Sequence, residues 1–189
     1  ELNFTDAANE YEGFTLNIEK TKEMNAGYTG TVTGDVKLKI YYDRNRYTVT
    51  VEHYYMDTAG NYPEKPSVAE DLKPYYGETL VHKDLAREIK GLSFNENKTI
   101  QENGNRTQTQ VTGNTVIRLY YDRSVCTVTY DYRTNGGTSA DQETVKTYYG
   151  ADADLSVAAY KNGWEHAGWN TKSDSGTGLT RYTVTGNVT

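Results

Sequence analysis

Cysteine and long apolar runs are what this sequence most clearly lacks. It has a single cysteine, Cys126, in 189 residues, so no disulfide can form within the chain and folding does not depend on oxidation. No stretch approaches the ~20 consecutive apolar residues that a membrane-spanning helix needs. We therefore expect no membrane insertion by this chain and a fold that needs no crosslink.

Positive charge and metal-binding patterns are scarce as well. The chain has 20 Lys and Arg against 26 Asp and Glu, a net charge of −6 and a pI near 5.1. This balance argues against nucleic acid or an anionic membrane surface as a partner, because either would require clustered basic residues. His53, His82 and His166 form no i, i+4 pair and have no cysteine close in sequence. We expect structural histidines, no metal site and no cofactor.

What the sequence does have is internal repetition. The segment Val32–Arg44 reads like Val111–Arg123, at an offset of 79 residues, and a third copy opens at Val184. Tyr75-Tyr76-Gly77 and Tyr148-Tyr149-Gly150 each lie 36 residues before the next Val-Thr-Gly. At an offset of 78 residues, 6–14 aligns with 84–92. The shared order of these landmarks predicts units built on one plan.

The repeat spacing predicts three parts. We expect residues 1–43 to be the C-terminal half of a unit, 44–123 to be a complete unit, and 124–189 to be a unit that lacks its last strand. A unit of about 75–80 residues is large enough to close its own core. Arrays of such modules usually serve to reach and to bind, and they seldom catalyse a reaction.

Alternating apolar residues predict the strands of the complete unit. Tyr47–Glu52 should be a half-buried strand with Tyr47, Val49 and Val51 inward, and the closing strand should point Ile117, Leu119 and Tyr121 inward. Between them we expect a turn at 58–61, a second strand through 67–70, a helix over 83–89 and a short strand at 93–94. In the next unit the corresponding features are a turn at Asn135-Gly136-Gly137 and a strand through 143–146.

The order strand, strand, helix, strand, strand is that of a β-grasp sheet that holds one helix, although it also permits other α+β layouts. We predict an α+β fold of small, ubiquitin-like β-grasp modules arranged end to end. The joints at 43–46 and 122–125 contain neither Gly nor Pro and are typical of stiff, extended connections. Arg44, Arg46 and Arg123 at these joints are expected to bridge to acidic groups of the adjoining unit.

Several of these residues also resemble known repeat families. Residues 124–189 resemble the Listeria-Bacteroides repeat of internalin-type surface proteins, and 44–123 resemble a mucin-binding-protein (MucBP) repeat. The first likeness rests on Thr127–Asp131, Asn135–Gly137, Tyr149-Gly150, Gly163–Thr171 and Val184–Asn187; the second rests on Tyr47–Val51, Asp57–Asn61 and Tyr76-Gly77. The resemblance implies a β-grasp fold, export, and an extracellular place in a Gram-positive surface protein whose other parts attach it to the cell wall. Neither family implies catalytic residues.

The residues therefore favour a noncatalytic surface module. The first hypothesis is adhesion to a host glycoprotein or glycan, with Tyr41, Tyr54 and Tyr120 on a solvent-facing sheet surface as the ligand-binding candidates. The alternative is a purely structural stalk whose partners are the neighbouring repeats of its own chain. An enzyme is a third hypothesis, because carboxylates scattered along the sequence could meet in the fold as a catalytic pair of the glycosidase type.

Other residues have expected structural roles. Cys126 occupies a core-facing strand position and should be a buried, inert thiol. Trp164 and Trp169 are expected to pack in the core, and stacking on a sugar ring is the alternative. The half unit 1–43 should be the least stable part, because it lacks an opening hairpin beside the closing strand that runs through Val36, Leu38 and Ile40.

Overall fold

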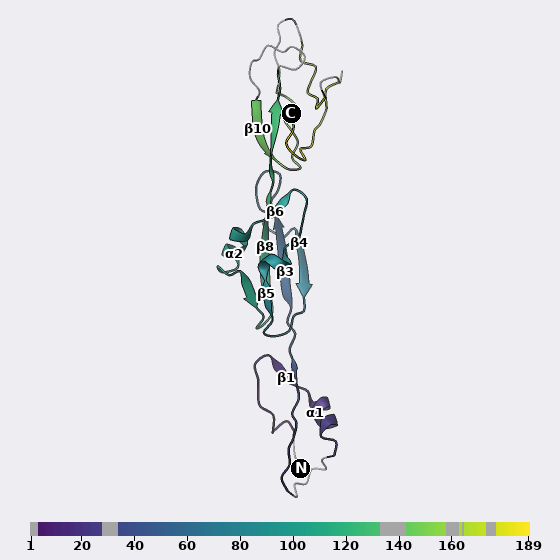
Figure 1. Cartoon of the computed structure of the whole chain (residues 1–189), viewed down its shortest axis with the longest axis vertical. Coiled ribbons are helices and arrows are strands. Elements are labelled where there is room, and N and C mark those ends of the chain that lie inside the picture. Colours follow the sequence, from purple (N-terminus) through teal and green to yellow (C-terminus); the bar gives the residue numbers. More distant parts are fainter. Residues whose placement is uncertain (1–3, 28–33, 133–142, 158–162, 164, 173–176) are drawn as a thin grey trace.

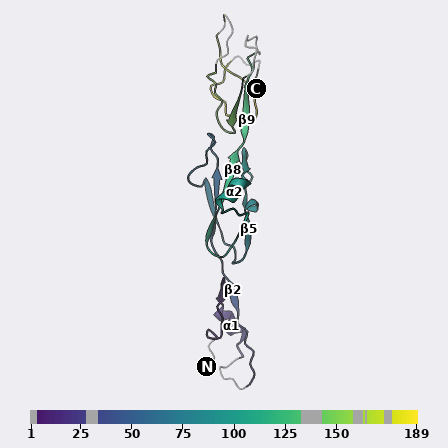
Figure 2. The same ribbon diagram turned by 90° about the vertical axis from the view of Figure 1, so that its left-hand side faces the viewer.

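The computed structural model describes residues 4–27, 34–132, 143–157, 163, 165–172 and 177–189. The chain is long and narrow in two perpendicular views, and its parts follow one another along the long axis (Figures 1 and 2). We call residues 4–44 the N-terminal part, 47–123 the central part and 125–189 the C-terminal part. Among the residues described, no helix has the length and apolar character required to cross a bilayer.

A four-stranded sheet of order β4-β3-β8-β6 forms the middle of the central part. The central strands β3 (Val49–Tyr55) and β8 (Thr115–Arg123) run parallel, from Val49 opposite Thr115 to Tyr55 opposite Tyr121. The outer strands β4 (Val68–Leu72) and β6 (Leu92–Phe94) pair antiparallel with β3 and β8. The strands predicted for this sheet are thus confirmed, and the two-residue period explains β3 and β8 because each turns alternate apolar residues toward the core.

The core of the central part lies on one face of this sheet. Its fully buried members are Val49, Val51, Val111, Ile117, Leu119 and Tyr121. The inward orientation predicted for Val49, Val51 and the three closing-strand residues is confirmed, and Tyr47 packs against the cluster while remaining partly exposed.

The predicted helix over 83–89 is wrong. A 3₁₀ helix, η1 (His82–Leu85), ends at Ala86, whose ψ of 146° is extended. The α-helix α2 (Glu96–Glu102) lies instead in a polar stretch, where the Asn95 side chain caps it by accepting from the Lys98 backbone N–H. Thr99 is the residue that α2 buries, so the helix has no apolar stripe for periodicity to detect.

Two further features complete the central part. Strands β5 (Thr79–Val81) and β7 (Gln108–Gln110) form a separate antiparallel pair. The turn predicted at 58–61 is present, where Asp57 Oδ1 accepts from the backbone N–H groups of Ala59 and Asn61. It lies within a long connection, 56–67, between β3 and β4, rather than in a tight hairpin.

In the N-terminal part, β1 (Phe14–Leu16) pairs antiparallel with β2 (Tyr42–Arg44), and α1 (Ile18–Met24) follows β1. The closing strand predicted through Val36, Leu38 and Ile40 is wrong, since 34–41 form no strand and β2 begins only at Tyr42. The physical reason is the absence of a neighbour like β3 among the described residues of this part, because an extended segment needs a partner to become a ladder.

The C-terminal part holds the antiparallel pair β9 (Val125–Tyr130) and β10 (Glu143–Tyr148). Its small core contains Cys126, Val128, Tyr130 and Val184, with Trp169 packed against it. Burial of the Cys126 thiol and core packing of Trp169 are confirmed. The predictions for Trp164 and for the turn Asn135-Gly136-Gly137 lie outside the described residues.

Candidate functional site at the two joints

The joint between the N-terminal and central parts is built on Gly13. Its carbonyl accepts from the Asn45 backbone N–H at 2.8 Å, and the Asn45 carbonyl accepts from the Tyr76 N–H at 2.8 Å. The Tyr76 ring lies against Gly13, so that an added Cβ would be 2.0 Å from the ring. Gly13 also has a φ of 77°, which disfavours other residues. Both the backbone angle and the ring therefore require glycine.

The joint between the central and C-terminal parts repeats this geometry. The Gly91 carbonyl accepts from the Ser124 N–H at 2.9 Å, and the Ser124 carbonyl accepts from the Tyr149 N–H at 2.8 Å. Gly91 has a φ of 78°, and an added Cβ would be 2.1 Å from the Tyr149 ring. Asn45 and Ser124 make these bonds through backbone groups, so the shared pattern of bonds requires no particular side chain at that position.

The arginines at the joints agree only in part with the prediction that they bridge to acidic groups. Arg44 forms an ion pair with Glu78 at 3.4 Å, with both side chains at least 40% exposed, and such pairs contribute only about 0.2–1 kcal/mol. Arg46 instead stacks on the Tyr75 ring at 3.9 Å and donates to the Lys73 carbonyl. Bridging to acidic groups is thus wrong for Arg46, whose partners are an aromatic ring and a backbone carbonyl.

Arg123 ties the second joint together through backbone carbonyls. Its guanidinium donates to Met56 O at 2.8 Å and to Tyr149 O at 2.9 Å, one on each side of the joint, rather than to a carboxylate as expected. The 56–67 connection adds a contact at Gly60, which lies against the Tyr148 hydroxyl. A Cβ added to Gly60, whose φ is 85°, would be 2.5 Å from that hydroxyl oxygen. The long connection therefore reaches the next part of the chain.

The tyrosines proposed as ligand-binding candidates are less exposed than expected. Tyr54 and Tyr120 are each 8% exposed and stack on one another with ring centroids 4.8 Å apart. Tyr62 from the long connection packs edge-on to Tyr120, and Lys98 of α2 lies over the same ring. Exposure was thus wrongly predicted for both, because the surface taken as solvent-facing is covered by these elements. Burial raises the pKa of both hydroxyls.

Tyr41 is partly buried, and its backbone N–H donates to Thr21 Oγ1 of α1 at 3.0 Å. It lies in the N-terminal part, whereas the stacked pair Tyr54 and Tyr120 lies in the central part. The structure therefore does not bring the three candidates together on one strand pair. A ligand-binding role for Tyr41, Tyr54 and Tyr120 stays a prediction.

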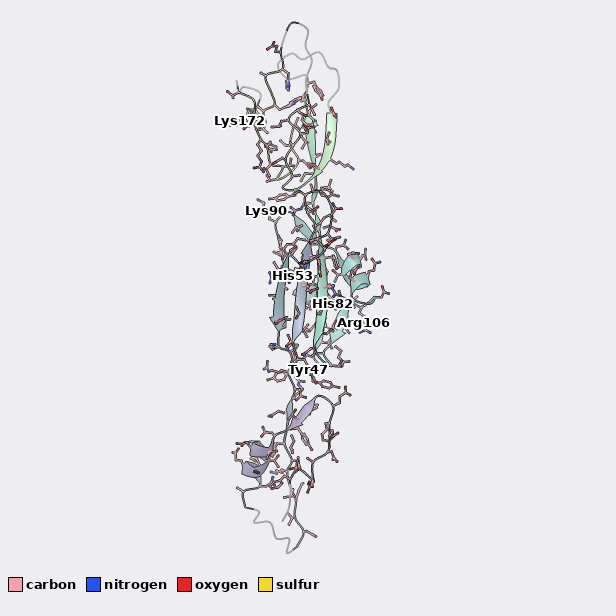
Figure 3. All side chains as sticks on the ribbon, turned by 180° about the vertical axis from the view of Figure 1, so that it is seen from behind. Tyr47, His53, His82, Lys90, Arg106 and Lys172 are labelled. Carbon is pink, nitrogen blue, oxygen red and sulfur yellow. The ribbon has the colours of Figure 1, made fainter. Side chains whose placement is uncertain are left out.

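The buried histidine His53 belongs to a polar network within the central part (Figure 3). The ionised Glu70 carboxylate only accepts, so it accepts from His53 Nε2–H at 3.2 Å, and it also pairs with Arg87 at 2.6 Å. In the neutral ring His53 Nδ1 is then the acceptor, and the Tyr121 hydroxyl donates to it at 2.9 Å while accepting from the Arg87 N–H at 3.0 Å. Burial lowers the pKa of His53, which keeps the ring neutral.

The other histidines also have structural surroundings. His82 is buried and its Nε2 lies 2.9 Å from Thr109 Oγ1, and burial lowers its pKa. His166 is exposed and packs edge-on to Trp169. Within the described residues, no group of three His, Cys, Asp or Glu side chains could hold a metal ion.

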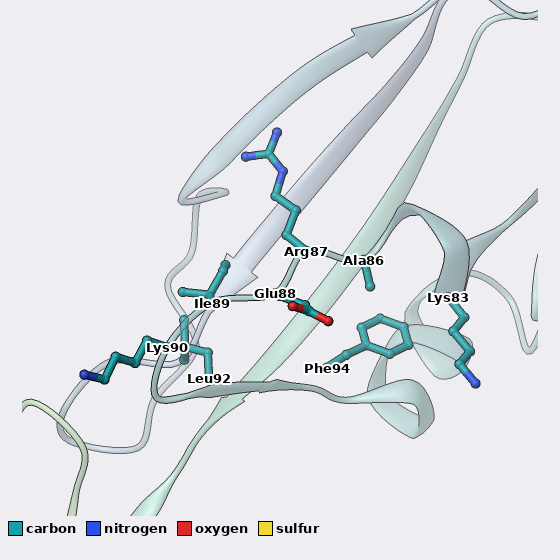
Figure 4. A pocket seen from close by; sticks show the side chains of 8 residues that line it. All are labelled: Lys83, Ala86, Arg87, Glu88, Ile89, Lys90, Leu92 and Phe94. Atoms are coloured by element: carbon teal, nitrogen blue, oxygen red, sulfur yellow. The ribbon is translucent and has the colours of Figure 1, made fainter. Parts of the chain in front are cut away.

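A groove lies at the sheet edge beside β6 (Figure 4). Apolar side chains of Ala86, Ile89, Leu92 and Phe94 line it together with Lys83, Arg87, Glu88 and Lys90. Glu88 is the one carboxylate in that lining, so the groove has no pair of acidic groups of the kind that glycosidases use.

Comparison with protein-family models, with curated proteins and with solved structures finds no match for this chain. The resemblance to the two repeat families therefore stays a prediction that rests on the residues quoted for it.

Proposed function

We propose that this chain is a noncatalytic, stiff spacer made of small β-grasp units in tandem, which projects another domain from the surface of a Gram-positive cell. The observation that carries the proposal is the recurrence of one joint: Gly13, Asn45 and Tyr76 correspond atom for atom to Gly91, Ser124 and Tyr149 in their backbone hydrogen bonds. A spacer needs the same rigid connection each time a unit is added.

The sheet of the central part supports the β-grasp assignment. Its first strand, β3, lies next to its last strand, β8, in parallel, while the second strand, β4, takes the outer edge beside β3. This is the arrangement expected when an opening hairpin and a closing strand hold a helix between them, and α2 packs against β8.

The same contacts explain why the joints should be stiff. Each joint is crossed by consecutive backbone hydrogen bonds, and a tyrosine ring occupies the space in which a side chain at the glycine would sit. A flexible Gly/Ser linker has neither restraint. Adhesion to a host glycan, attachment to the cell wall and extracellular location are predictions that the joint geometry leaves open.

The test is to loosen one joint and measure the spread of distances across it. Spin labels at N97C on α2 and K146C on β10, with Cys126→Ala, report the distance between the central and C-terminal parts. Gly91→Ala should broaden the distribution, because the new methyl group collides with Tyr149. Gly77→Ala is the matched control, since Gly77 has a similar φ of 78° but nothing within 4 Å of an added Cβ.

The control should leave the distribution narrow. A distribution that is already broad in the unaltered chain would refute a stiff spacer. Equal broadening in both glycine variants would mean that the Tyr149 contact does not set the stiffness of the joint.

A further inference from the structure

Exposed apolar side chains concentrate in the N-terminal part of the chain. Tyr11, Phe14, Ile18, Met24 and Val36 are between 40% and 53% exposed. Leu38, Ile40 and Tyr42, which follow Val36 with a period of two, are also partly exposed. One region of the molecule thus presents apolar surface to solvent that a small folded unit would ordinarily cover.

The N-terminal part repeats the local structure around α2 and β8. Strand β1 pairs with β2 as β6 pairs with β8: Leu16 lies opposite Tyr42, and Phe94 lies opposite Tyr121. Asn17 caps α1 as Asn95 caps α2, each accepting from a backbone N–H three residues on.

The helices are also attached to the chain in the same way. Thr21 Oγ1 accepts from the Tyr41 N–H at 3.0 Å, and Thr99 Oγ1 accepts from the Tyr120 N–H at 3.0 Å. Asn25 bonds both backbone groups of Lys39, and Asn103 bonds both backbone groups of Arg118. Residues 38–42 therefore hold the position relative to α1 that 117–121 hold relative to α2.

One element distinguishes the two parts. Beside β8, strand β3 pairs in parallel and buries Ile117, Leu119 and Tyr121 completely. Among the described residues of the N-terminal part, the strand that pairs with any of 38–42 is β1, at Tyr42, and none takes the place of β3; the corresponding Leu38, Ile40 and Tyr42 stay partly exposed. The chain itself thus shows what kind of element covers this surface.

The charge on this edge further specifies the strand that would pair with it. In the central part, Arg118 of β8 pairs with Glu52 of β3 at 3.2 Å. Lys39 takes the place of Arg118 and its side chain is exposed. An incoming strand with an acidic residue at the position of Glu52 would meet that charge.

We propose that the open edge along residues 36–42 is a docking site for a β-hairpin of the β3–β4 type. The docked strand runs parallel to 36–42, and it places a carboxylate opposite Lys39. Its alternate apolar residues lie on the same face as Leu38, Ile40 and Tyr42, as Val49 and Val51 share a face with Ile117, Leu119 and Tyr121. This is recognition by β-strand addition, in which main-chain hydrogen bonds give affinity and alternate side chains give specificity. It does not depend on the spacer function.

The test supplies such a hairpin from the chain's own sequence. Residues 45–78 are fused directly before Glu1, because 79 corresponds to 1 at the offset of 78 residues. Hydrogen exchange of 38–42 is then compared with that of 117–121. We expect slow exchange of both segments in the fused chain. In the chain without the graft we expect fast exchange within 38–42 at the amides of Leu38 and Ile40, since those of Lys39 and Tyr41 already bond to Asn25 and Thr21.

Two variants distinguish specific docking from a general effect of the added segment. Val49→Asp with Val51→Asp in the graft should return 38–42 to fast exchange. Lys39→Glu should weaken protection, and Glu52→Lys in the graft should restore it. Unchanged exchange of 38–42 in the fused chain would overturn the proposal, as would equal protection by the double aspartate graft.

A second copy of the chain is the competing occupant. Sedimentation of the ungrafted chain over a range of concentrations, with hydrogen exchange at each, tests it. Concentration-independent, fast exchange of 38–42 agrees with the proposal. Self-association that protects 38–42 would overturn it, because the edge would then be an interface between copies.

Discussion

At the scale of single residues, position in a network decides the chemistry of a side chain. His53 is fully buried and its two ring nitrogens face Tyr121 and Glu70, while the Arg87 guanidinium neutralises Glu70 from the outside. In the neutral ring Nε2–H donates to Glu70 and Nδ1 accepts from the Tyr121 hydroxyl. The hydrogen bond to Glu70 favours the charged ring, but burial outweighs it and lowers the pKa of His53.

The network predicts a loss of stability in mild acid. Because the pKa of His53 is lowered in the folded state, the unfolded chain binds the proton first as the pH falls below ~6.5. Stability should therefore be greater at pH 7.5 than at pH 5, measured as the free energy of unfolding by urea. His53→Gln should reduce this dependence to the part that the lowered pKa of His82 contributes, at a cost in stability at pH 7.5.

His166→Gln is the control, because that ring is exposed. It should leave the pH dependence as it is. A His53→Gln chain that loses as much stability between pH 7.5 and 5 as the unaltered chain would contradict the role given to His53. The lowered pKa of Glu70 belongs to a more acidic range, since its stabilisation is lost only as the pH falls below the pKa of a free carboxyl and through the lower pKa of Glu70 in the folded chain.

At the scale of elements, the two short helices are held by polar side chains rather than by apolar stripes. α2 has seven residues, too few to be stable alone in water. Asn95 caps its start, Thr99 meets the Tyr120 N–H from its middle, and Asn103 closes its end on Arg118. The same spacing, Asn-x-x-x-Thr-x-x-x-Asn, holds α1 through Asn17, Thr21 and Asn25.

Removing the last of these side chains should detach the helix from the sheet. Asn103 donates to Thr99 O and Arg118 O and accepts from the Arg118 N–H. Asn103→Ala should therefore cost ~1–3 kcal/mol of unfolding free energy, because it leaves backbone groups of β8 without partners. Asn97→Ala, at an exposed position of the same helix, should change stability by less than ~0.5 kcal/mol. Equal effects in urea denaturation would count against this role for Asn103.

At the scale of the whole molecule, the parts lie one after another rather than side by side (Figure 1). A compact chain of 189 residues would have a radius of gyration near ~16 Å. Small-angle scattering should give a clearly larger value, with a pair-distance distribution skewed to long distances. A radius close to the compact value would show that the parts fold back on one another in solution, and it would remove the main support for a spacer.

The sequence by itself determined the strands of the four-stranded sheet and which of their residues face its core. Ile117, Leu119 and Tyr121 alternate with Val116, Arg118 and Tyr120, and a strand with one buried face must alternate in this way. The repeat of Tyr76-Gly77 as Tyr149-Gly150 likewise predicted that the two segments have equivalent positions in the structure. The backbone hydrogen bonds of the two joints confirm this. Such features are local or repeated, so they can be read from one chain.

Only the tertiary structure decided where the helices lie and what covers the second face of the sheet. Leu85 and Ala86 have helical spacing, but both pack against the core from η1 and the extended chain after it. Tyr54 and Tyr120 alternate outward, yet α2 and Tyr62 cover them. These outcomes depend on hydrogen bonds between residues 15 to 60 positions apart, such as Asn103 to Arg118 and Tyr62 to Asp122. Periodicity reports which side of an element is apolar, and it carries no information about a polar partner that distant in the chain.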